Sequence, residues 1–145
     1  MKAESTIMPA SPYVVEALEE GKCLVTFFEN IAALPADPEA EEDTTKYWYD
    51  EYRLEVSNRD GLIANIENNQ SAWLQAAKNA EFEMLATEVR SKRDKLLTKS
   101  DKYALSDYPI TEDQKGLVAT YRQALRDVPE QEGFPYQIVW PVLLI

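Results

Sequence analysis

The sequence predicts an α+β protein, and three observations support this fold class. Segments before residue 60 alternate apolar and polar residues, which is typical of strands. Apolar residues then recur at helical spacing from Leu62 to Leu97. A shorter helical stretch with its own start and stop signals follows, and after it the sequence continues as an apolar tail. We therefore expect a small N-terminal antiparallel sheet of about three strands, a long helical segment, and a C-terminal short helix with an extended arm.

The expected sheet begins with a hairpin. The β-prone stretches at Tyr13–Val15 and Lys22–Phe28 are separated by Glu20-Gly21, which is turn chemistry. Lys46–Val56 alternates strictly and predicts a third strand with one buried face. Cys23 lies in the second strand, where we expect a small buried hydrophobic side chain and not a nucleophile.

The segment between the second and third strands is strongly acidic. It holds two prolines and five acidic residues, which are Asp37, Glu39, Glu41, Glu42 and Asp43. Like charges at this density favour a solvated loop. The run lacks the alternating Asp/Asn and the central glycine of a calcium-binding loop, so we expect no metal there.

The long helical segment leaves two alternatives open. Residues 67–71 are weak helix formers, so the segment is either one bent helix or two helices. An unbroken helix would be about 54 Å long, more than three strands can cover, so part of it would project, fold back or form a homo-oligomer. Five cations lie in its last turns, where the negative end of the helix dipole favours positive charge. The alternative interpretation of these cations is a basic patch that binds a partner. The five cations are Arg90, Lys92, Arg93, Lys95 and Lys99.

The last helix has a defined start and end. Thr111 and Gln114 have the spacing of a capping box, and Pro129 disfavours helix at the residue before it. The tail from Gly133 to Ile145 is apolar, and its prolines forbid a continuous helix. We therefore expect this apolar tail to be covered by its own domain, by a second copy of the chain or by a bound partner protein.

We expect the chain to divide into three parts: residues 1–60 with the sheet and the acidic loop, residues 61–99 with the long helical segment, and residues 100–145 with the C-terminal module.

Composition argues against catalysis, cofactors, nucleic acid and membranes. The 145 residues carry a net charge of −11, and residues 1–75 hold 15 acidic and only 5 basic side chains. Such a chain repels phosphates and anionic lipid. There is no histidine, so imidazole-based triads and metal sites are excluded, and the four glycines are isolated, so no phosphate-binding loop exists. We also expect no signal peptide and no membrane span.

The C-terminal residues carry a family resemblance. Arg93-Asp94-Lys95-Leu96-Leu97 precedes Ser100-Asp101, and Asp107 lies near Pro109. The string continues with Tyr121-Arg122-Gln123-Ala124-Leu125-Arg126-Asp127-Val128-Pro129, then Gly133-Phe134-Pro135 and Trp140-Pro141. From Arg90 to Pro141 the chain resembles the phage tail assembly chaperone family, whose members are encoded beside tail and tail-fibre genes or fused to fibre proteins. That family often has tryptophan directly after the Ser-Asp pair; here Lys102 and Tyr103 follow, so Tyr103 would serve through a shifted register.

The resemblance implies a non-catalytic bacteriophage protein that binds a tail or tail-fibre protein during assembly in the host bacterial cytoplasm. One alternative is a structural tail or fibre component of the virion, in which the long helix oligomerises. Another is an acidic inhibitor of a host defence or nucleic-acid enzyme.

Trp, Tyr and Arg are the residues in which binding energy concentrates, and they mark a candidate partner-binding set. Its members are Tyr121, Arg122, Leu125 and Arg126 on one side of the short helix, and Phe134, Ile138 and Trp140 on the arm. The alternative is that Tyr121, Leu125, Phe134 and Trp140 form a small core of their own.

Overall fold

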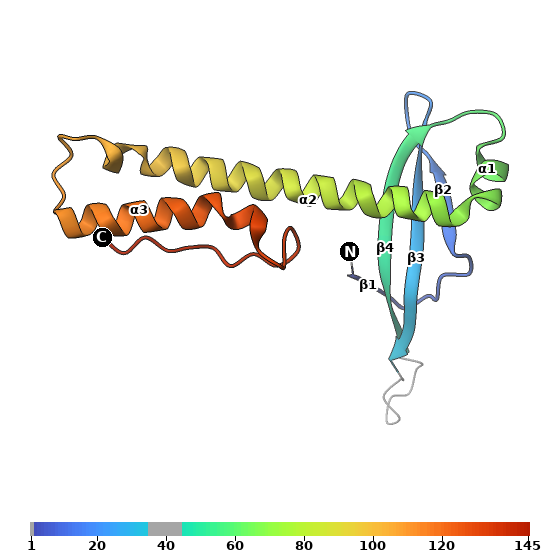
Figure 1. Cartoon of the computed structure of the whole chain (residues 1–145). Coiled ribbons are helices and arrows are strands. Elements are labelled where there is room, and N and C mark those ends of the chain that lie inside the picture. The colour runs from blue at the N-terminus through green and yellow to red at the C-terminus, as the bar shows by residue number, and fades with distance from the viewer. Residues whose placement is uncertain (1, 35–44) are drawn as a thin grey trace. The chain divides into compact units, whose positions relative to one another are not determined.

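A computed structural model describes residues 2–34 and 45–145 of the chain (Figure 1). It divides into two compact units, Met1–Glu81 (unit 1) and Phe82–Ile145 (unit 2), and the boundary falls within one helix. The fold class is α+β, as the sequence predicts. The division into residues 1–60, 61–99 and 100–145 stays a prediction, and the acidic run at 37–43 lies outside the described residues.

Unit 1 contains a four-stranded antiparallel sheet in the order β1-β4-β3-β2. The strands are β1 (Lys2–Ser5), β2 (Tyr13–Ala17), β3 (Lys22–Leu34) and β4 (Lys46–Ser57). The prediction of about three strands was therefore one strand short. The missed strand, β1, has only four residues and no apolar alternation, and it forms because its backbone pairs with β4.

The predicted hairpin is confirmed as β2 and β3. Its turn places Glu20 and Gly21 at φ angles of 58° and 70°, the left-handed region that glycine adopts at little cost. The Leu18 amide donates to the Lys22 carbonyl at 2.8 Å across the turn.

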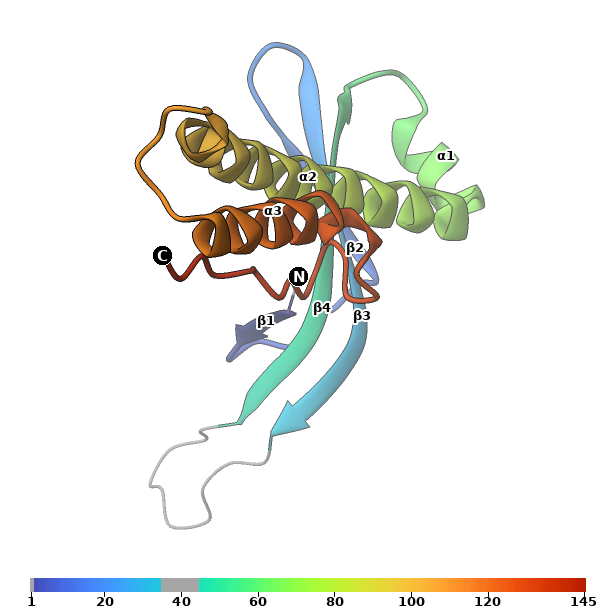
Figure 2. The same ribbon diagram turned by 60° about the vertical axis from the view of Figure 1, so that its left-hand side comes forward.

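The core of unit 1 lies between one face of the sheet and two helices. Cys23, Val25 and Phe27 alternate along β3 and are buried, and their cross-strand partners in β4 face the same side. Figure 2 shows the first turns of α2 crossing this face. The helices contribute Leu62, Ile66 and Ala77 to the same cluster. Cys23 is thus a buried thiol that packs as a small hydrophobic residue, as expected.

The long helical segment consists of two helices, α1 (Leu62–Asn68) and α2 (Gln70–Ser100). The break falls at Asn69, inside the run of weak helix formers, and this decides between the two alternatives. Side chains stabilise the junction, because Trp73 Nε1 donates to Asn65 Oδ1 at 2.9 Å.

Unit 2 is a helical hairpin with an arm. It comprises the remainder of α2, the short turns η1 (Asp101–Ala104) and η2 (Val128–Glu130), α3 (Glu112–Arg126) and the segment to Ile145. In both views α3 runs antiparallel to this part of α2 and beside it (Figures 1 and 2). Shielded side chains recur along α2 at alternating spacings of four and three, which places them on one helical face. They are Phe82, Ala86, Val89, Arg93, Leu96 and Ser100.

Candidate partner-binding surface

The predicted helix start and stop position the first part of the candidate surface. Thr111 accepts a hydrogen bond from the Gln114 amide at 3.2 Å, and the Gln114 side chain accepts one from the Thr111 amide at 2.9 Å. This is a complete capping box, which satisfies two amides that the first turn leaves without helical partners. The helix ends at Arg126, three residues before Pro129, as predicted.

Arg122 points into unit 2. It donates to the Leu97 carbonyl at 3.0 Å and to Ser100 Oγ at 2.6 Å, and it pairs with Asp101 at 2.8 Å. Leu97 is among the last four residues of α2, whose carbonyls lack a backbone partner within the helix, and Ser100 Oγ also donates to the Leu97 carbonyl at 2.7 Å. Arg122 therefore caps α2 from the neighbouring helix, and its side chain is only 17% exposed.

The other predicted residues of α3 differ in exposure. Leu125 is fully buried and Tyr121 is partly buried, whereas Arg126 is exposed. Arg126 lines a surface depression between α3 and the connector after η1, where Leu105 is also exposed. Of the predicted set on this helix, only Arg126 presents its side chain freely to solvent.

The predicted arm residues pack against α2. The Phe134 ring meets the Phe82 ring edge-on at 6.2 Å between centroids, and the Arg90 guanidinium lies 5.5 Å from the Phe134 ring centre. The Lys92 ammonium lies 4.3 Å from the Trp140 ring centre, a cation–π contact. Ile138, between them, is half-buried. Phe134, Ile138 and Trp140 thus lie on the inward side of the arm.

A glutamine side chain fixes the arm, and the sequence offered no signal for it. Gln131 donates to the Val139 carbonyl and accepts from the Val139 amide, both at 2.9 Å. Its amide group thus reproduces the paired hydrogen bonds of a neighbouring strand at one residue of the arm.

The outward side of the arm is apolar and exposed. Val139, Val142 and Leu144 are 80%, 75% and 77% exposed, and we call these three residues the outward row. No charged residue occurs from Gly133 to Ile145. The candidate set chosen from the sequence contains the larger residues of the same arm, Phe134, Ile138 and Trp140, and does not include this row; its role in binding stays a prediction.

The connector between the helices holds the aromatic that the family comparison singled out. Tyr103 is half-buried, and its ring meets the Tyr108 ring edge-on at 5.1 Å between centroids. Such edge-to-face pairs are a favourable aromatic geometry, so Tyr103 contributes to holding this connector.

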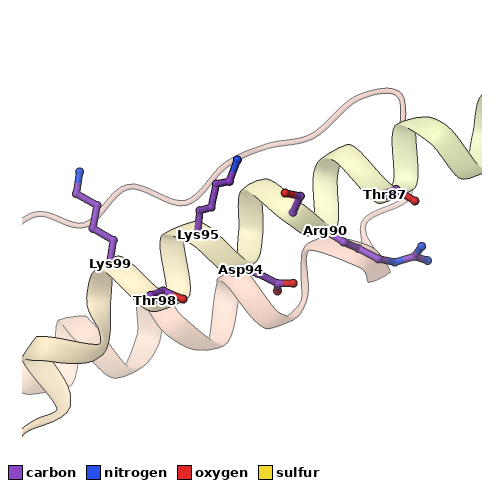
Figure 3. A pocket seen from close by; sticks show the side chains of 7 residues that line it. Thr87, Arg90, Asp94, Lys95, Thr98 and Lys99 are labelled. Carbon is purple, nitrogen blue, oxygen red and sulfur yellow. The ribbon is translucent and has the colours of Figure 1, made fainter.

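A second depression lies on α2 itself, and each of the residues that line it carries a polar or charged group (Figure 3). We call it the α2 polar face. It is formed by Thr87, Arg90, Ser91, Asp94, Lys95, Thr98 and Lys99.

Unit 1 contains groups whose pKa values are raised by their surroundings, among them Lys78 and Tyr52. Lys78 Nζ lies 2.5 Å from Glu29 Oε2, and this hydrogen bond raises the pKa of Lys78. Burial raises the pKa of Tyr52, whose ring centre lies 5.1 Å from the Lys78 ammonium. The described part of the chain holds no group of three or more His, Cys, Asp or Glu side chains placed to bind a metal ion. Within residues 2–34 and 45–145, no helix combines the length and apolar character that crossing a membrane requires.

Comparison with known proteins gives a family match for the C-terminal segment. The chain finds no match among curated proteins or among solved structures. The model of the phage tail assembly chaperone protein family matches residues 86–143, all within unit 2. The resemblance carried by the residues from Arg90 to Pro141 is therefore confirmed, because the C-terminal segment of this chain matches the phage tail assembly chaperone protein family.

Proposed function

We propose that this chain is a non-catalytic bacteriophage protein that assists tail or tail-fibre assembly by binding a tail or tail-fibre protein. The family match supports the role in phage tail assembly. Binding in place of catalysis is supported by the absence of histidine from the sequence. During assembly the protein acts in the host bacterial cytoplasm.

The observation that carries the proposal is the outward row of the arm. Val139, Val142 and Leu144 are held at least 75% exposed on a segment without charge. Burying a side chain of this size contributes about 1.5–3 kcal/mol, so a partner that covers all three gains substantial free energy. Packing and the Gln131 hydrogen bonds fix the arm beforehand, which lowers the entropic cost of binding.

The seven residues selected from the sequence take two roles in this proposal. Tyr121, Arg122 and Leu125 hold the helical hairpin, while Phe134, Ile138 and Trp140 hold the arm against α2. These six position the outward row. Arg126, with exposed Leu105 nearby, is a further contact for the partner.

The test is co-expression of the chain with each tail and tail-fibre protein of the phage that encodes it, followed by affinity purification. Replacing Val139, Val142 and Leu144 by serine should abolish co-purification of the partner. Far-UV circular dichroism and the melting temperature should stay unchanged, because these side chains make no buried contacts.

A matched variant carries three serines at exposed apolar positions of unit 1: Val14, Leu18 and Ile31. It should bind the partner as the natural sequence does. Retained binding by the outward-row variant, or failure of every tail and tail-fibre protein to bind the natural chain, would contradict the proposal.

A further inference from the structure

The α2 polar face is the feature of unit 2 that the arm does not account for. Its residues recur along one side of α2, and none of them is apolar. Figure 3 shows Lys95 and Lys99 extending on the same side of the helix. Arg90 lies over the Phe134 ring of the arm, but the shielded stripe of α2 runs along its other side and uses neither Lys95 nor Lys99.

The cations of this face are poorly neutralised. Among the described residues, neither Lys95 nor Lys99 has an ion pair or a hydrogen bond. Arg90 lies 4.0 Å from Glu83, at the limit of an ion pair. The single carboxylate of the face, Asp94, is already engaged by Arg93 at 2.8 Å. Within the described residues, the face therefore presents two lysines without an ion pair or a hydrogen bond, beside an arginine that lies over the Phe134 ring, in a chain whose net charge is −11.

The helix dipole accounts for only one of these cations. Its favourable effect on a cation is confined to the last turn of a helix. α2 ends at Ser100, so Lys99 lies in that turn, while Lys95 and Arg90 lie before it. Arg90 is held over the Phe134 ring, so the dipole and the arm together leave only the placement of Lys95 unexplained.

We propose that the α2 polar face binds a carboxylate-rich segment of a partner protein. Lys95 and Lys99 are separated by about 6 Å along the helix axis, and Arg90 and Lys99 by about 13 Å. Acidic residues two apart on a strand, or four apart on a helix, are spaced by about 6–7 Å. Such a segment can pair one carboxylate with each lysine, while the hydroxyl groups of Ser91 and Thr98 supply further donors.

A protein segment fits this face better than nucleic acid does. The whole chain repels a polyphosphate at long range, and few cations are offered for phosphate contacts. No aromatic side chain lines the face, so it has no platform on which a base could stack. The inference concerns a different surface from the outward row and does not depend on it.

The experiment uses the full chain, labelled with nitrogen-15, and a hexaglutamate peptide as the probe at low salt. The peptide should shift the backbone amide signals of residues 87–99 in a saturable way. The variant Lys95→Gln/Lys99→Gln should bind it roughly tenfold more weakly, because two exposed pairs are lost. The matched variant Lys22→Gln/Lys46→Gln, which removes two exposed lysines of the sheet, should bind as the natural chain does.

Three outcomes would overturn the proposal. One is the absence of shifts in residues 87–99, or equal binding by the two double variants. A second is tighter binding of a ten-nucleotide oligothymidine than of hexaglutamate, which would assign the face to nucleic acid. A third is self-association of the chain in the absence of peptide, if this association is sensitive to salt and is lost in the variant Lys95→Gln/Lys99→Gln. That result would show that the face binds a second copy of the chain.

Discussion

Arg122 connects α3 to the C-terminal end of α2 in the helical hairpin of unit 2. Replacing it by glutamine removes the donor to the Leu97 carbonyl and to buried Ser100. We expect a loss of about 1–3 kcal/mol in the free energy of unfolding, measured by chemical denaturation, because two hydrogen bonds from a charged donor are lost while only the bond from Ser100 Oγ to the Leu97 carbonyl remains. The pair with Asp101 adds little to this value, since that carboxylate is well exposed.

Arg126→Gln is the matched control for that substitution. Arg126 lies on the same helix but is exposed, so its replacement should change the free energy of unfolding by less than about 0.5 kcal/mol. Equal effects of the two substitutions would show that Arg122 does not hold the hairpin.

Lys78 makes the stability of unit 1 sensitive to alkaline pH. Its hydrogen bond with Glu29 raises the pKa of Lys78 above the ordinary 10.5, and burial raises the pKa of Tyr52 above 10.0. A raised pKa means that the folded state holds the proton more tightly than the unfolded state. The stabilisation is therefore complete below about pH 10 and is lost as the pH rises through the folded-state pKa values.

The measurement is the melting temperature between about pH 8 and 12, followed by tryptophan fluorescence. The natural chain should lose stability above about pH 10. Glu29→Gln, which removes the carboxylate partner of Lys78, should flatten this decline. An identical decline in the variant would contradict the assignment to Lys78.

Single residues show where sequence reasoning reaches its limit. The helical period placed Tyr121, Arg122, Leu125 and Arg126 on one side of α3, but burial separates Leu125 from Arg126 at the edge of that side. On the arm, Pro141 interrupts the strand alternation, so Val139 and Val142 both face outward although they are three residues apart. The helical period does not predict the first arrangement, and the period of two of an extended segment does not predict the second.

At the level of elements, the capping box of α3 offers a quantitative test. Thr111→Ala removes the side chain that accepts from the Gln114 amide, so that amide loses its partner. We expect destabilisation by about 1 kcal/mol in chemical denaturation. Thr120→Ala, an exposed position in the middle of the same helix, is the control and should have a smaller effect. Equal losses would indicate that the cap contributes nothing specific.

Elements with local signals were predictable, and those that depend on distant partners were not. The β2–β3 hairpin, β4 and α3 each carry their own turn, alternation or cap in the sequence. β1 carries none, and pairing with β4 alone makes it a strand. The sequence could not decide between one helix and two, because weak helix formers are compatible with both. In the structure, the hydrogen bond between Trp73 and Asn65 spans the break between α1 and α2.

The cations of α2 also differ from one another through contacts between elements. The sequence placed them near the helix end, and the dipole offered a sufficient reason for their presence. The structure separates them into cations engaged on aromatic rings and cations without partners. Only the packing of the arm, which no local pattern encodes, makes that distinction.

At the scale of the whole molecule, the family match and the division into units agree. Residues 86–143 match the family and lie wholly within unit 2, whereas the sheet of unit 1 lies outside the match. The acidic residues concentrate in the first half of the sequence. The assembly role proposed for this protein therefore rests on unit 2, with its outward row and its α2 polar face.

The central claim is that the protein binds a tail or tail-fibre protein during assembly and is then released. Quantitative mass spectrometry of affinity-purified complexes from infected cells and of purified phage particles tests it most directly. We predict that the protein is found with a tail or tail-fibre protein in the cell extract and is absent from finished particles. Stoichiometric presence in the particles would contradict the claim and would identify the protein as a structural component of the virion.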